Sequence, residues 1–265
     1  MSDQLPEIFW EIHSGLPREG PGDNGSTRRA FLMLKDLPKK PNMLDIGCGP
    51  GMQTIELARL SNGQIDALDN YQPFLNQLEL SIKKEGFTDK IKLVKGDMFN
   101  LPYDCNTFDL IWSEGAIFII SFEKGLREWK RLLTDKGYLV VSELSWLRND
   151  APLEVKKYVE HVYPANKTIK ENLNIVKKVG YRVIGSFILP TESWWTNYYR
   201  PIEAKLPILK EKYHSNAEKL RHIDYHEVEI DMFRKYSDYY GYVFYIMQNK
   251  LENSTNLHKV RNFGN

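Results

Sequence analysis

Cysteine is scarce in this 265-residue chain, and no charge of one sign is in excess. The two cysteines, Cys48 and Cys105, belong to no Cys-x-x-Cys or Cys/His spacing, so no pattern typical of a zinc site is present. We therefore expect two reduced thiols and no metal. Lysine and arginine number 36 against 35 aspartates and glutamates, a net charge of +1. Nucleic-acid-binding proteins normally carry a clear basic excess, so a nucleic-acid partner is not expected.

Long hydrophobic runs are also missing. No apolar stretch approaches the ~18–20 residues that a membrane-spanning helix needs. The first residues have no basic segment leading into an apolar run, so no signal peptide is apparent. We expect a cytoplasmic protein without a membrane partner, which acts on a small-molecule substrate. The sequence leaves open whether it is a monomer or a homodimer.

Strand and helix patterns alternate from residue 42 onward. Short apolar strands are predicted at 42–46, 65–69, 91–94, 108–112 and 137–144, and helices at 53–60, 73–84 and 122–133. Such alternation with short links predicts an α/β fold, a mostly parallel sheet with helices on both faces. Ligands bind beyond the carboxyl ends of the strands in these sheets, which draws attention to Asp45, Asp69, Asp97 and Glu114.

We expect one domain over 1–265, made of several parts. These are an N-terminal cap at 1–29, a core at 30–150, the rest of the sheet at 151–250, and a polar tail at 251–265. Within the cap, Gly15–Gly25 is predicted to be a gating loop, and Ser26 to be the N-cap of the helix that follows. An aromatic-rich insertion at about 191–240 is predicted to be mostly helical and to precede the last strand.

A glycine-rich turn follows the first strand. In the stretch Leu44-Asp45-Ile46-Gly47-Cys48-Gly49-Pro50-Gly51, three alternating glycines come after an acid. Glycine permits both a sharp turn and a close approach of the backbone to a ligand, and the next helix begins with unpaired N–H groups. A dinucleotide fingerprint, G-x-G-x-x-G, would need a third glycine where Met52 stands. This mismatch argues against a nicotinamide oxidoreductase.

The acid-x-Gly-x-Gly-x-Gly pattern resembles the first motif of class I S-adenosylmethionine-dependent methyltransferases. The resemblance covers roughly residues 30–145, with further strands near 181–189 and 241–249. It implies a Rossmann-like sheet of seven strands, S-adenosyl-L-methionine as methyl donor and S-adenosyl-L-homocysteine as product.

Cofactor-binding positions follow from matching this motif residue by residue. The resemblance implies that Asp45 lies near the amino-acid end of the cofactor and that Asp97 accepts from the adenine amino group. A carboxylate at Asp69 can accept both ribose hydroxyl hydrogen bonds, although an aspartate there could also cap a helix. The full expected set is Asp45, Gly47, Cys48, Gly49, Gln53, Asp69, Asn70, Asp97, Met98 and Ser113.

The acceptor side carries weaker patterns. The segment Trp112–Ala116 lacks the Asn/Asp-Pro-Pro-aromatic tetrapeptide of enzymes that methylate nucleobase or glutamine amino groups. This favours the small-molecule branch, which includes quinone-biosynthesis, glycine/sarcosine and phosphoethanolamine methyltransferases. Glu114 and His13 are the catalytic candidates, with a helix cap and an ordinary loop histidine as their alternatives. Trp194, Trp195 and Tyr198 either line the acceptor site or form the core of the insertion.

These patterns predict methyl transfer to a small amine, hydroxyl or quinone-like carbon by in-line displacement. Two alternatives keep the same cofactor: a non-catalytic protein that binds or senses S-adenosylmethionine, and a methyltransferase for a macromolecule.

Overall fold

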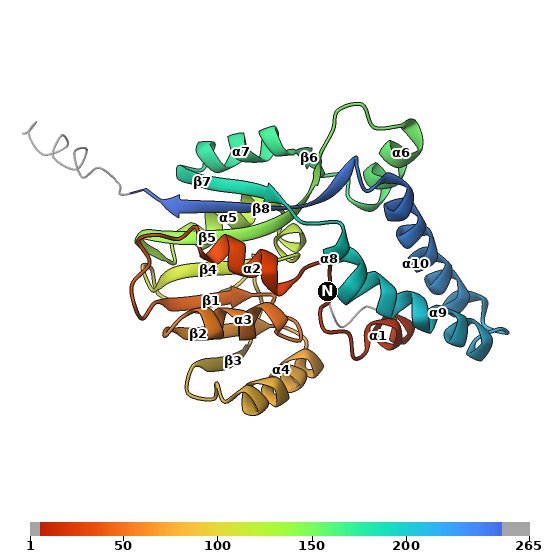
Figure 1. Cartoon of the computed structure of the whole chain (residues 1–265), viewed down its shortest axis with the longest axis horizontal. Coiled ribbons are helices and arrows are strands. Elements are labelled where there is room, and N and C mark those ends of the chain that lie inside the picture. Colours follow the sequence, from red (N-terminus) through yellow and green to blue (C-terminus); the bar gives the residue numbers. More distant parts are fainter. Residues whose placement is uncertain (1–5, 251–265) are drawn as a thin grey trace, which may run out of the picture.

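A computed structural model describes residues 6–250 and contains one sheet flanked by helices (Figure 1). The strands are β1 (Asn42–Ile46), β2 (Gln64–Asp69), β3 (Ile91–Lys95), β4 (Phe108–Glu114), β5 (Leu133–Trp146), β6 (Lys167–Thr168), β7 (Tyr181–Ile188) and β8 (Tyr240–Asn249). Their order is β3-β2-β1-β4-β5-β8-β7, and the short β6 pairs with β5. Strands β1 to β5 pair in parallel, whereas β8 runs antiparallel to both β5 and β7. The expected α/β class with a mostly parallel sheet is confirmed.

Helices lie over both faces and at one end of the sheet. They are α1 (Glu7–His13), α2 (Asn24–Phe31), α3 (Met52–Leu60), α4 (Gln72–Glu85), α5 (Phe122–Lys130), α6 (Leu153–Val162), α7 (Ile169–Lys178), α8 (Glu192–Trp194), α9 (Arg200–Lys212) and α10 (Ala217–Tyr236). A short 3₁₀ helix, η2, spans Ile117–Ile119, and a π-helical turn, η3, spans Trp195–Tyr199. One hydrophobic cluster lies between the sheet and α2, α3 and α4, and a second lies under α5 and α7.

The two hydrophobic clusters arise because side chains of each buried strand point alternately to the two faces of the sheet. In β1, Met43 belongs to the first cluster and its neighbour Leu44 to the second, because successive side chains point to opposite faces. Both are almost completely buried. Burial on both faces is the rule for parallel strands covered by helices, and it accounts for the nearly continuous apolar runs.

The glycine turn between β1 and α3 places the start of α3 at the carboxyl end of the sheet. Gly51 caps α3 with a φ of 89°, in the left-handed region. A Cβ at this position would lie 2.1 Å from Leu78 Cδ1 of α4, so a side chain cannot fit. The turn therefore depends on glycine for both its torsions and its packing against α4.

Several sequence expectations need correction. The N-cap of α2 is Asp23, whose Oδ1 accepts from the Ser26 amide, so Ser26 is a first-turn residue and not the cap. Helix α1 and strand β6 were not anticipated. The insertion is helical as expected, since α8, η3, α9 and α10 occupy residues 192–236. The predicted polar tail, 251–265, lies outside the described residues.

Residues 7–23 and 192–236 lie at the carboxyl ends of the parallel strands and together form what we call the lid (Figure 1). Lys205 Nζ of α9 donates to the carbonyl of Ile12 at 2.9 Å, and Tyr213 donates to Glu11 at 2.6 Å. Asn197 Nδ2 donates to the Gly22 carbonyl at 2.9 Å. Two segments far apart in sequence are thus joined into one cover.

Candidate functional site

A cavity of about 780 Å³ lies between the strand ends and the lid. This volume is in the range of small-molecule and cofactor sites. One part is lined by the glycine turn and the polar residues after β2 and β3, and another by aromatic residues of the lid, α6 and β8. Among the expected site residues, the cavity lining includes His13, Gly47, Cys48, Gly49, Gln53, Asp69, Asn70, Asp97, Met98, Glu114, Trp194 and Tyr198.

The glycine turn forms a close backbone wall. Gly47 has a φ of 72°, and a Cβ there would lie 2.5 Å from Ala116 Cβ. Gln53 Nε2 donates to the Cys48 carbonyl at 2.9 Å and holds the turn against the start of α3. Burial raises the pKa of the Cys48 thiol well above its ordinary value, so the thiol stays protonated.

Asp69 joins the turn after β1 to the turn after β2. Its Oδ2 accepts from the Gly49 amide and its Oδ1 accepts from the Tyr71 amide, each at 2.9 Å. Burial raises its pKa, whereas these backbone hydrogen bonds lower it. Each carboxylate oxygen keeps a second lone pair for a ligand hydroxyl. The neighbouring Asn70 is exposed at the edge of the cavity.

Asp97 and Met98 follow β3 on the same side of the cavity. Asp97 is exposed, and its Oδ1 accepts from the Phe99 amide at 2.9 Å, which leaves its other oxygen available. Trp129 Nε1 donates to the Met98 carbonyl at 3.5 Å. Met98 also packs against the second hydrophobic cluster, so it contributes to both the core and the cavity wall.

Asp45 and Ser113 lie behind the wall and do not line the cavity. Asp45 Oδ2 accepts from Thr54 Oγ1 at 2.6 Å, and its Oδ1 has no partner in the described part of the chain. Burial raises the pKa of Asp45 to about 7. Ser113 Oγ donates to the Ile46 carbonyl at 2.9 Å and so pins β4 to β1. Both side chains make structural contacts behind the cavity wall, and their direct cofactor contacts stay a prediction.

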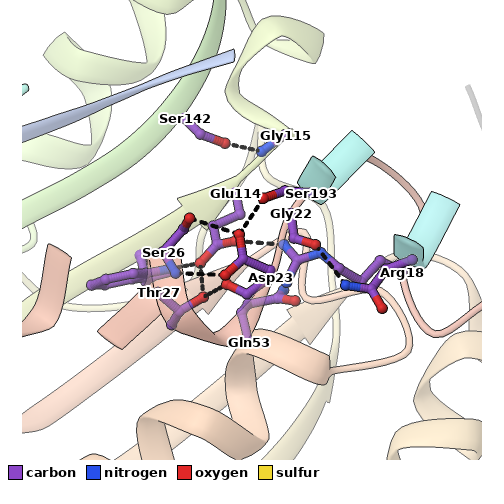
Figure 2. A network of polar contacts seen from close by, with 12 residues as sticks. Arg18, Gly22, Asp23, Ser26, Thr27, Gln53, Glu114, Gly115, Ser142 and Ser193 are labelled. Atoms are coloured by element: carbon purple, nitrogen blue, oxygen red, sulfur yellow. Dashed lines mark hydrogen bonds and ion pairs between the residues drawn. The ribbon is translucent and has the colours of Figure 1, made fainter. Parts of the chain in front are cut away.

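Glu114, the first catalytic candidate, is held by the lid and by its own strand (Figure 2). Its Oε2 accepts from Arg18 Nη2 at 2.5 Å, and its Oε1 accepts from Thr27 Oγ1 at 2.7 Å and from Trp112 Nε1 at 2.8 Å. Both oxygens of this buried carboxylate are therefore engaged. This arrangement suits a carboxylate that fastens the lid better than one that accepts a proton from substrate.

Arg18 is a site residue that sequence reasoning missed. It is buried and lines the cavity, and its Nε and Nη1 have no partner within residues 6–250. Gly22 lies against the guanidinium, because a Cβ there would be 2.5 Å from Arg18 Cζ (Figure 2). The available signal was an arginine set among the glycines and prolines of the gating loop, with no acidic partner nearby at helical spacing.

His13, the second candidate, lies inside the lid with two polar contacts. Its Nδ1 is 2.9 Å from Glu19 Oε2, and its Nε2 is 3.2 Å from His226 Nε2 of α10. Burial lowers the pKa of both His13 and His226 to about 4, so both imidazoles are neutral at pH 7. Burial raises the pKa of Glu19 to about 8.

The aromatic candidates divide between the cavity and the protein core. Trp194 stacks on Phe233 with ring centroids 4.0 Å apart, and Tyr198 is buried beside it in η3. Both line the cavity. Trp195 does not line the cavity, so of the two alternatives only packing within the insertion fits it. The π-helical turn directs it toward Tyr199, and the Arg234 guanidinium lies 5.0 Å from its ring centroid.

Residues 6–250 contain no group of three or more histidine, cysteine, aspartate or glutamate side chains arranged to hold a metal ion. None of their helices combines the length and the apolar character needed to span a bilayer.

Similarity to known proteins was found in both sequence and structure. Residues 44–141 match the family model described as a methyltransferase domain. A sterol 24-C-methyltransferase of Gibberella zeae is 29% identical over 131 residues, which cover 48% of this chain and 34% of that protein. A demethylmenaquinone methyltransferase of Staphylococcus epidermidis is 32% identical over 121 residues, covering 44% of this chain and 49% of that protein. The chain thus spans a half or less of these two relatives.

A structural relative matches along nearly the whole chain. It is a SAM-dependent methyltransferase from Geobacter sulfurreducens, solved in complex with S-adenosyl-L-homocysteine. The TM-score is 0.80 at 18% identity, and the match covers 93% of this chain and 99% of that protein. At this level of identity the similarity establishes the fold. Residues 44–141 thus match a methyltransferase domain, and the chain has the same Rossmann-like fold as this methyltransferase.

Proposed function

We propose that the protein is an S-adenosylmethionine-dependent methyltransferase that acts on a small molecule. The observation that carries this proposal is Asp69, a strand-end carboxylate bonded to the amide of Gly49 and open to the same cavity as the lid aromatics. A carboxylate in this position suits a ribose diol. The methyltransferase domain match over residues 44–141 supports the same conclusion.

The residues present fit this cofactor. Asp69 would accept from the ribose hydroxyls, Asp97 would accept from the adenine amino group, and the turn at Gly47–Gly49 would lie beneath the ligand. Arg18 offers two unpartnered guanidinium nitrogens in the cavity wall. A carboxylate is the group that a guanidinium binds best, and the cofactor carries one on its amino-acid part.

Once bound, S-adenosylmethionine supplies a methyl group on an electrophilic sulfonium. The chain itself has to align the acceptor and exclude water, which in favourable cases accounts for ~7–11 kcal/mol of a barrier. The lid performs both tasks in this proposal, since its two segments close over the strand ends. Glu114 is a positioning residue that fastens Arg18 and Thr27. The neutral imidazole of His13 is a polar wall of the acceptor space.

Calorimetric titration of the full chain with S-adenosylhomocysteine tests the cofactor assignment. We expect one site per chain with micromolar affinity, and the absence of binding would overturn the proposal. A screen over amines, phenols and quinone precursors, measured as release of S-adenosylhomocysteine from S-adenosylmethionine, then tests catalysis. Binding without release for any acceptor would identify a sensing protein instead, and release only with a protein or nucleic acid would identify a macromolecular acceptor.

A further inference from the structure

The part of the cavity beyond the glycine turn is lined by one face of α10. His222, Tyr225, His226 and Glu229 recur at intervals of three and four residues, which places them on the same side of the helix. All four line the cavity. Helix α10 therefore presents one carboxylate, that of Glu229, to this part of the cavity, which we call the acceptor space.

Tyrosines surround this carboxylate. Six of them line the cavity, from α6, η3, α10 and β8, and we call them the tyrosine cage: Tyr158, Tyr198, Tyr199, Tyr225, Tyr240 and Tyr242. Tyr199 donates to Glu229 Oε1 at 3.1 Å. Burial raises the pKa of all six phenols, and the Glu229 carboxylate contributes to the rise in each of them. The carboxylate is thus close to every tyrosine of the cage.

One hydroxyl of the cage is both buried and without a hydrogen-bond partner in the described chain. Tyr240 is 4% exposed, and its OH makes no hydrogen bond within the described chain. A buried phenol usually finds a partner, because an unsatisfied polar group costs ~1–3 kcal/mol. Since Tyr240 lines the cavity, an unsatisfied hydroxyl lies within the wall of the cage.

The charges around the cavity are unevenly distributed. Its acidic lining residues are Glu19, Asp69, Asp97, Glu114 and Glu229. Arg18 is the only lysine or arginine among the described residues that line the cavity, and it is paired with Glu114. The histidines His13 and His226 are uncharged at pH 7. Apart from Arg18 and the histidines, the described cavity lining has no group that neutralises a phosphate or carboxylate, whereas the faces of the cage and the Glu229 carboxylate attract a cation.

We infer that the methyl acceptor is an amine, held in its ammonium form by Glu229 and the faces of the tyrosine cage. This inference rests on the proposed function and specifies its acceptor. It selects amines over hydroxyl and quinone-like carbon acceptors, and over acceptors that carry a phosphate. Glu229 is then a catalytic residue, because it touches the acceptor.

The proton of the ammonium has a defined destination. The N–H bond breaks, an O–H bond forms on Glu229, and the nitrogen keeps the electron pair that it needs as a nucleophile. Burial raises the pKa of Glu229 to about 7, so the carboxyl group can hold this proton near neutral pH. After methylation the nitrogen is again positively charged, and the rings of the cage face it.

Binding of a matched pair of probes tests the inference directly. The full chain, saturated with S-adenosylhomocysteine, is titrated with choline and with its uncharged carbon isostere dimethylbutanol. We expect choline to bind about tenfold more tightly, since a desolvated cation–π site contributes up to about 2 kcal/mol. Equal affinities would overturn the inference while leaving the cofactor assignment intact. Failure to bind S-adenosylhomocysteine would instead overturn the proposed function.

Substitutions in the cage test whether its residues cause the preference for choline over dimethylbutanol. We expect Glu229→Gln and Tyr158→Leu to lower choline affinity about tenfold and to leave the affinities for dimethylbutanol and S-adenosylhomocysteine unchanged. Glu227→Gln is the matched control, because Glu227 lies on α10 outside the cavity lining and pairs with Lys210. An unchanged preference in Glu229→Gln would contradict the inference. The acceptor screen with the unmodified chain gives a second test. Release of S-adenosylhomocysteine with alkene acceptors, and with none of the amines, would also contradict the inference.

Discussion

The Asp69 carboxylate accepts a hydrogen bond from the Gly49 amide at 2.9 Å, across twenty residues of sequence. A single side chain therefore sets the distance between the two turns that would receive an adenosyl group. Because the carboxylate organises the wall and also lines the cavity, we expect its negative charge to matter more than its shape.

Asp69→Asn is predicted to weaken S-adenosylhomocysteine binding at least about tenfold. Hydrogen bonds to a charged acceptor contribute about 1.5–3 kcal/mol each, and the amide offers the ribose hydroxyls a neutral acceptor on one side. Calorimetric titration measures the change. Asp89→Asn, in an exposed turn outside the cavity, is the control and should bind like the unmodified chain. Equal affinity in both variants would exclude Asp69 from the ribose site.

Gly47→Ala is predicted to abolish cofactor binding and to lower stability by more than Gly86→Ala. Both residues have left-handed φ angles, 72° and 75°. A Cβ at Gly47 would lie 2.5 Å from Ala116 Cβ, whereas a Cβ at Gly86 has nothing within 4 Å. Gly86→Ala should therefore cost only the backbone strain of about 1–2 kcal/mol. Urea unfolding measures both, and equal losses would show that crowding at Gly47 is relieved by movement.

Arg18→Met is predicted to destabilise the protein by about 3–5 kcal/mol, because the buried Glu114 charge loses its cationic partner. The double variant Arg18→Met with Glu114→Gln should recover much of that loss. Arg127→Met breaks an exposed pair with Glu123 and should cost under about 1 kcal/mol. Urea unfolding gives the energies. A double variant as unstable as Arg18→Met alone would mean that packing, and not charge pairing, fixes Arg18.

Stability is predicted to fall as the pH drops from 6.5 to 4, partly through His13 and His226. Their folded pKa values of about 4 lie below the ordinary 6.5, so the unfolded chain binds more protons in this window. Their contribution is complete above pH 6.5 and is lost toward pH 4, by up to about 3 kcal/mol per residue. His13→Gln with His226→Gln should flatten this slope, measured by urea unfolding across the window.

Exposed His161 on α6 provides the control for this slope, since its side chain contacts water in the folded chain as well. The slope should be unaffected by His161→Gln. If the double variant keeps the full slope of the unmodified chain, the acid sensitivity arises elsewhere.

The common location of the acids that line one side of the cavity could be predicted from sequence because its determinants are local. Asp69 ends β2 and Asp97 follows β3, and a parallel sheet brings strand ends to one edge regardless of what surrounds them. The same logic predicted the helical insertion and the order of the early elements. The contact of the Asp45 side chain with Thr54 was not evident from its position near the turn.

The lid could not be predicted in the same way because its contacts are distant in sequence. Helix α1 has only seven residues, too short to be stable alone, and it exists through packing on α9 and α10. Arg18 finds Glu114 across 96 residues. Glu229 did have a local signal, the spacing of His222, Tyr225 and His226 along α10, but its meaning depended on which helix face was covered.

The π-helical turn at Trp195–Tyr199 has a consequence for how this protein can diversify. A π turn contains one residue more than the α-helical turn that it replaces, and here it brings Tyr198 and Tyr199 side by side into the buried interior. Deletion of one residue would convert the π turn into a regular α-helical turn. Every later side chain of the helix would then rotate about the helix axis by about a third of a turn relative to the residues before it. The glycine turn and the strand ends would be untouched. One in-frame deletion would therefore reshape the aromatic side of the cavity in a single evolutionary step.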